Sequence, residues 1–139
     1  MTETLTLSQD SRTTAGVLLL TIVAVEYGGW FMLRVVRGSQ AATPFQRSFF
    51  RAGHAHAGVF VILALVCQVL ADAARLGGVL GLLARDGVAA AAILMPAGFF
   101  LSAAGRGRTS PSRLIWLLYA GLTLLALGVA SLGIGLLAA

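Results

Sequence analysis

Four long apolar runs constrain the fold of this chain more than any other feature. They cover about residues 14–36, 49–71, 87–104 and 114–137, and short segments containing arginine separate them. A helix needs roughly 20 mainly apolar residues to cross a hydrocarbon core of about 30 Å. Backbone polar groups in lipid must be satisfied within the spanning structure, which favours helices. The sequence therefore predicts an all-α integral membrane protein, a single domain built as a four-helix transmembrane bundle.

The balance of apolar and charged residues agrees with this prediction. Of the 139 residues, 58% are hydrophobic and 11% are charged, and the mean hydropathy is +0.92. Soluble domains carry about 25% charged residues. The chain has no Cys-x-x-Cys pair, phosphate-binding glycine loop or serine with an evident base. Hydrolytic and nucleotide-driven chemistry therefore lack sequence support, which favours a non-enzymatic protein.

All ten basic residues are arginines, and their distribution predicts the orientation. Seven flank the first and third connections: Arg34, Arg37, Arg47, Arg51, Arg106, Arg108 and Arg113. Three lie toward the other side: Arg12, Arg75 and Arg85. Arginine is enriched in cytoplasmic connections, so we expect a multi-pass protein of the cytoplasmic membrane with both termini outside. The net charge of +5 then indicates contact with lipid headgroups rather than nucleic acid.

Three features refine the predicted spans. Residues 76–84 are apolar but only nine long, so we expect a connecting or interfacial segment between Arg75 and Arg85. Pro44 lies in a polar stretch that predicts a loop before the second span, and Pro96 should kink the third. Small residues spaced four apart are typical of close helix packing, either within one bundle or in an oligomer. Two such pairs are Gly98 with Ser102 and Ser131 with Gly135.

Glu26 is the strongest functional signal in the sequence. It lies inside the first run, eight residues before Arg34, which is about 12 Å along a helix. An ionisable side chain in the hydrocarbon costs a few kcal/mol, so it needs a partner, a proton or a water-filled cavity. His54 and His56 enter the second run from the same side, three and five residues after Arg51. The pattern predicts a proton or cation site of Glu26, His54 and His56, which are also the candidate metal ligands.

The helical wheel separates the two histidines, because residues two apart on a helix point about 200° from each other. His54 shares a face with Gln68 and Asp72, so we expect it to face the bundle interior. These two residues and Tyr27 are the expected supporting polar groups. For His56 we consider a hydrogen bond near the membrane surface, a contact with a second subunit, or a second site. Alternatively, Glu26 hydrogen-bonds to His54 or Tyr27 and only sets the register of the helices.

Two segments, VEYGGWFMLR at residues 25–34 and FQRSFFRAGHAHAG at residues 45–58, resemble small four-helix membrane proteins of high-GC bacteria. The resemblance implies a membrane bundle and no particular reaction. Three hypotheses follow from the residues themselves. The first is proton- or cation-linked transport or conduction by an oligomer. The second is a membrane redox protein that binds haem or a transition metal through His54 or His56, together with Glu26 or a residue from a second copy. The third is an accessory subunit of a larger membrane complex.

Overall fold

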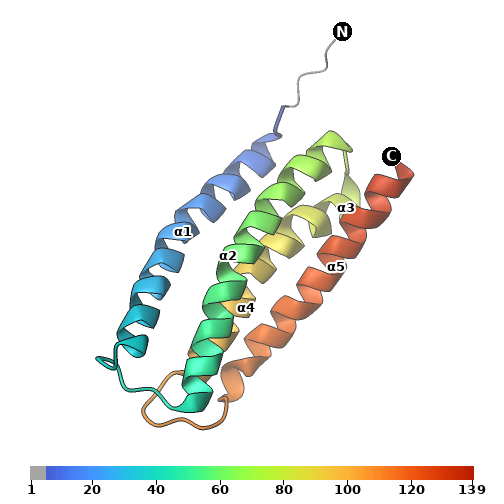
Figure 1. The fold of residues 1–139 in the computed structure, drawn as a ribbon. Coiled ribbons are helices and arrows are strands. Elements are labelled where there is room, and N and C mark those ends of the chain that lie inside the picture. The colour runs from blue at the N-terminus through green and yellow to red at the C-terminus, as the bar shows by residue number, and fades with distance from the viewer. Residues whose placement is uncertain (1–5) are drawn as a thin grey trace.

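The computed structural model describes residues 6–139 and confirms an all-helical four-helix bundle. No strand occurs within that range. Four helical units are long and apolar enough to cross a membrane, which makes the chain a multi-pass membrane protein by length and composition. They are Gln9–Val36, Pro44–Ala73, Gly78–Ala103 and Arg113–Ala138. The start of the first unit and the end of the last lie at the same end of the bundle (Figure 1).

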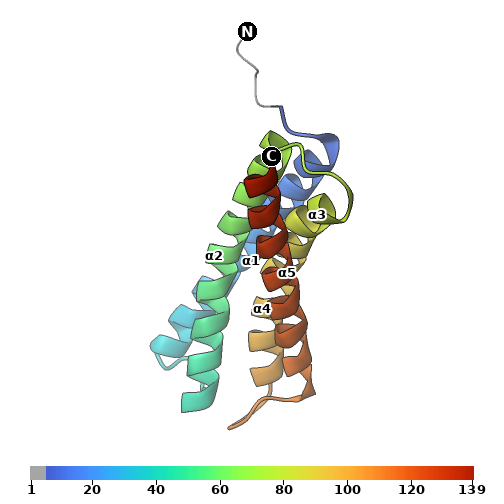
Figure 2. The same ribbon diagram turned by 90° about the vertical axis from the view of Figure 1, so that its right-hand side faces the viewer.

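The four long helices pack in the order α1, α2, α4, α5, so that α2 and α4 are the two inner helices. Helix α2 (Pro44–Ala73) lies between α1 (Gln9–Val36) and α4 (Val88–Ala103), and α4 packs on α5 (Trp116–Ala138). Figures 1 and 2 show α1 at one side of the bundle. Only 6% of the most apolar stretch of α1 is buried, against 28% to 39% in the other three units. Helix α1 therefore leaves most of its surface open to lipid or to a partner.

The first two helices begin earlier than the apolar runs do. Ser8 caps α1, its side chain accepting a hydrogen bond from the backbone N–H of Ser11. Thr43 and Gln46 form a capping box at the start of α2, with Pro44 as its first residue. A proline suits this position because the first helical N–H has no partner inside the helix. Pro44 thus starts the second helix, where the sequence predicted a loop continuing toward residue 49.

The third span also begins earlier than predicted. Residues 76–84 were expected to connect two spans, but α3 (Gly78–Leu82), the π-helical turn η1 (Leu83–Gly87) and α4 follow one another as one helical unit. Arg85 lies within η1, and its charge is paired inside the bundle instead of ending the helix. A π turn inserts an extra residue and redirects the side chains around it.

Small residues allow close packing of helices within the chain. At Gly98 an added Cβ would collide with the backbone N of Leu118, and at Gly121 it would lie 2.6 Å from the Met95 Cγ. Ser102, Ser131 and Gly135 are also buried. The predicted small-residue pairs therefore serve packing within one bundle. Ten buried, mostly small residues form the core, namely Leu18, Val61, Ala64, Cys67, Ala71, Ala84, Val88, Ala89, Ala92 and Leu132.

Candidate functional site

His54 is half-buried on α2 and lies directly against the glycine pair of α1. A Cβ added at Gly28 would be 3.4 Å from the His54 Nδ1, and one added at Gly29 would be 3.3 Å from the Cε1. A side chain at either position would press on the ring, which would have to shift by a few tenths of an ångström. The imidazole thus packs directly on the two glycines. His54 therefore faces a neighbouring helix, in agreement with the inward face that the helical wheel predicted.

Glu26 lies on α1 close to this glycine pair, but its side chain is exposed. Tyr27 and Trp30 beside it are 66% and 51% exposed, and their rings contact each other at 5.5 Å. Glu26 and Gly29 are three apart, so their Cβ positions are about 5–6 Å from each other on one face. The Glu26 Cβ is therefore within roughly 9 Å of the His54 ring. Within residues 6–139 the two side chains share neither a hydrogen bond nor an ion pair.

His56 is on the other flank of α2. Its Nδ1 is 2.7 Å from the carbonyl oxygen of Ala52, and its ring lies 5.3 Å from the rings of Phe60 and Phe99. The imidazole is thus hydrogen-bonded within its own helix and packs toward α4. Among the described residues, no three histidine, cysteine, aspartate or glutamate side chains are grouped to hold a metal ion. The structure does not bring Glu26, His54 and His56 together around one ion.

A groove runs between α1, α2 and α4 on the side of His54. Its wider part has a volume of about 890 Å³, and a narrower part of about 240 Å³ continues deeper, where His54 forms part of the wall. The two parts share Ala24, Gly28 and Phe100. The wider part opens at the loop end of the bundle, which we define by the connections at residues 37–43 and 104–112. His54 therefore borders both the groove and the helix that carries Glu26.

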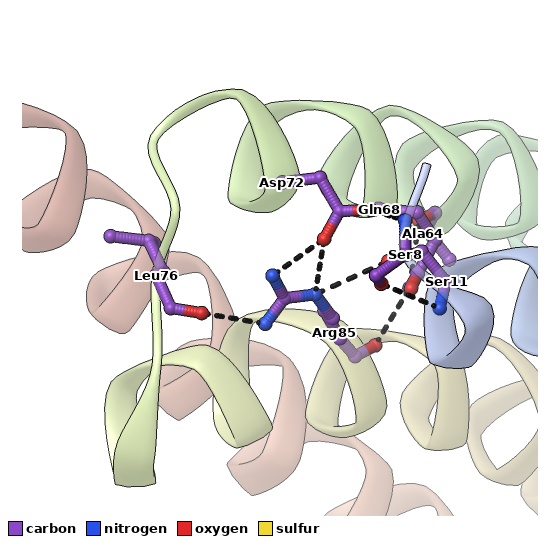
Figure 3. Close-up of polar contacts among 7 residues, drawn as sticks. All are labelled: Ser8, Ser11, Ala64, Gln68, Asp72, Leu76 and Arg85. Atoms are coloured by element: carbon purple, nitrogen blue, oxygen red, sulfur yellow. Dashed lines mark hydrogen bonds and ion pairs between the residues drawn. The ribbon is translucent and has the colours of Figure 1, made fainter. Parts of the chain in front are cut away.

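A second polar cluster lies at the opposite end of the bundle, around a pair formed by Asp72 and Arg85 (Figure 3). The Arg85 Nη2 is 2.6 Å from the Asp72 Oδ1, and the Nε is 3.1 Å from the same oxygen. The two side chains are 15% and 5% exposed, respectively. The backbone N–H of Ser8 donates to the Asp72 Oδ2, and Arg85 donates to Ser11. The pair thus ties the start of α1 to α2 and η1.

Gln68 extends this cluster inward. Its Nε2 donates to the carbonyl oxygens of Arg85, at 3.1 Å, and of Ala64, at 3.4 Å. The sequence placed Gln68 and Asp72 on the face of His54, but they lie about 21 and 27 Å farther along α2. They support the Arg85 cluster instead of the histidine. Arg85 was expected to bound a connection between two spans. The signal for its pairing was an acid and an arginine 13 residues apart, at the edges of two apolar runs.

No protein-family model, curated protein or solved structure matches this chain. The fold and its polar sites define a small multi-pass membrane protein with a histidine-lined groove. Its function is therefore inferred from the geometry of its own residues.

Proposed function

We propose that the protein carries out proton- or cation-linked transport or conduction, with Glu26 and His54 as its exchanging groups. The observation that carries this proposal is the position of His54 on the glycine pair, one helical turn from Glu26. Glycine at position 29 places no side chain between the imidazole and the turn of α1 that carries Glu26. To reach the imidazole, the Glu26 side chain has to turn toward Gly29, or one water has to bridge the two groups.

The ring of His54 is suited to pass a proton between two environments. One ring nitrogen lies toward Gly28, which lines the groove, and the other lies toward Gly29, which shares a face with Glu26. An imidazole can take a proton on one nitrogen and release the proton on the other. The proposed transfer therefore takes place between His54 and Glu26, across the glycine pair.

Glu26 also supports the proposal that the working form is an oligomer. A carboxylate exposed on the lipid-facing side of a span is costly unless it is protonated or paired. Helix α1 is the least buried of the four spans, so a second copy packed on it would cover Glu26. The same exposed face would suit a larger membrane complex, which is the accessory-subunit alternative.

The redox alternative requires a haem or metal site with more than one protein ligand. Because His54 and His56 lie on opposite flanks of α2, a haem iron or transition metal on His54 would need a further ligand from Glu26 or from a second copy. The absorption spectrum of protein purified from native membranes tests this alternative. A haem band that His54→Ala removes would favour it over ion transport.

The main test is ion flux in liposomes that contain the purified protein. We expect an imposed proton or cation gradient to dissipate with the native chain, and at least about tenfold more slowly with Glu26→Gln or His54→Ala. Asp10→Asn is the matched control, because Asp10 is an exposed acid in the first turn of the same helix. Absence of flux in the native protein, or full flux in Glu26→Gln, would overturn the proposal.

The association is tested separately by native mass measurement in mild detergent, where we expect dimers or larger assemblies. A strictly monomeric particle that still transports would contradict the role of an interface between copies.

A further inference from the structure

The groove between α1, α2 and α4 has two chemically distinct ends. Toward the membrane interior its wall is aromatic, formed by one ring from each of the three helices: Phe31, Phe50 and Phe100. These rings contact one another at 5.1 to 6.5 Å, which makes a continuous apolar surface. At the loop end the rim is polar and includes Gln40, Gln46 and Arg106. The groove is thus amphipathic along its length.

The length of the groove along α1 is comparable to the length of a lipid acyl chain. Its inner wall reaches Ala24, twelve residues before the end of α1 at Val36, or about 18 Å along the helix. Beyond Ala24 only the narrower part continues, past His54 toward Thr21. Such a long apolar channel beside α1, the helix most exposed to lipid, can take up an acyl chain from the bilayer.

The rim at the loop end is held in place and carries positive charge. The Gln46 Nε2 donates to the carbonyl oxygens of Ala103 and Gly105, and Thr43 donates to that of Arg108. These bonds fasten the connection after α4 to the start of α2. Arg106 is exposed, and within residues 6–139 it makes neither a hydrogen bond nor an ion pair. Arg106 therefore lies at the mouth of the groove without a counterion among residues 6–139.

The backbone of this rim also needs glycine. Gly105 and Gly107 have φ values of +113° and +65°, and both line the groove next to Arg106. Other residues rarely adopt such angles. Arg108 folds over Gly105, with its Nε 3.3 Å from where a Cβ would be. The compact turn thus brings a second arginine beside the mouth of the groove.

We propose that this groove binds one anionic phospholipid of the surrounding bilayer. One acyl chain would lie along the phenylalanine wall, and the phosphate would be held by Arg106, with Arg108 adding positive charge. The charge at the rim selects an anionic headgroup, because each arginine at a membrane surface attracts acidic lipid by about 1 kcal/mol. The proposal does not depend on ion transport.

A second copy of the chain is the main competing occupant, and the geometry favours the lipid. The groove faces the side of α1 that carries Ala24 and Gly28, whereas Glu26 is two residues from each and points about 160–200° away. An interface that covers Glu26 would therefore leave the groove open. A flexible acyl chain can follow a groove that becomes smaller toward His54 more readily than a helix about 10 Å wide can.

The experiment measures lipid retained by the purified full-length protein in native mass spectra. Delipidated protein is mixed with phosphatidylglycerol or with phosphatidylcholine of the same acyl chains. We expect one phosphatidylglycerol per chain to bind in preference to phosphatidylcholine. Arg106→Gln should weaken this binding about fivefold, the factor expected for one arginine. Arg37→Gln is the control, since Arg37 is exposed near the same end but does not line the groove.

The apolar part of the groove is tested with a filling substitution. Ala24→Phe should reduce the binding of both lipids, whereas Val23→Phe on the adjacent exposed position should not. Equal retention of the two lipids by the native protein would overturn the proposal, as would an equal loss in Arg106→Gln and Arg37→Gln. If Ala24→Phe changes the number of chains per particle and leaves lipid binding intact, the groove holds a second copy and the proposal is wrong.

Discussion

Asp72 and Arg85 are joined across the connection between the second and third spans, with 2.6 Å between the Asp72 Oδ1 and the Arg85 Nη2. Because both side chains are largely buried, Asp72→Asn leaves a cation without its partner. We expect this change to lower the free energy of unfolding in detergent by roughly 3 kcal/mol or more.

The matched control for this pair removes both charges. Replacing Asp72 and Arg85 together by leucine should cost less than Asp72→Asn alone, because no unpaired charge then remains in the bundle. Unfolding of both variants is compared in the same detergent. If the double variant is the less stable one, the pair is a larger source of stability than its burial suggests.

Gly98 lies at a close approach of α4 and α5, against the backbone of Leu118. Gly98→Ala should force these helices apart and lower the free energy of unfolding by about 1–3 kcal/mol, the usual cost of overpacking. Gly133→Ala is the control on α5, since an added Cβ there meets open space. It should be neutral or slightly stabilising, because alanine favours helix over glycine. Equal losses at both positions would contradict this account of the packing.

The proposed link between Glu26 and His54 predicts non-additive effects. Glu26→Gln and His54→Ala should each reduce any measured proton or cation response, and the double variant should be little worse than the more damaging single one. A coupling energy of roughly 0.5 kcal/mol or more would be expected for groups in one site. Additive losses would place the two residues in separate environments and leave His54 as a packing residue on the glycine pair.

The arginine distribution predicts that the loop end is cytoplasmic. Cysteine introduced at Ser39 or Ser110 should then resist an impermeant thiol reagent in intact cells, and cysteine introduced at Asp10 should react. Thr2, a further labelling position at the predicted outer end, lies outside the described residues. The native Cys67 is fully buried and should stay silent. If the cysteine at position 39 is labelled and the one at position 10 is protected, the orientation is the reverse of the predicted one, and the four spans are unaffected.

The membrane architecture could be predicted from sequence because its cause is local. Each run of apolar residues must satisfy its own backbone hydrogen bonds in lipid, so run length alone predicts a helix and its ability to span. The ends of the helices were less predictable. The caps at Ser8 and Thr43 lie in polar sequence outside the apolar runs, where hydropathy carries no signal.

The face that each helix presents depended on the protein around it. On α2 the polar residues are few and distinct, so the wheel could assign His54 to an inward face. On α1 apolar residues occur all round the helix, and the exposure of Glu26 followed only from where α2 packs. The role of Gln68 and Asp72 likewise depends on Arg85, which joins them from the next span. Their distance from His54, by contrast, follows from the rise of a single helix.

The sequence by itself thus determined that the chain forms four membrane-spanning helices, since lipid imposes the same requirement on every apolar segment. Only the tertiary structure decided that Arg85 lies inside the third unit, that His54 rests on Gly28 and Gly29, and that a groove opens beside them. These features arise where residues far apart in the chain meet. A buried charge or a close ring contact is stable only when its partner on another helix is present.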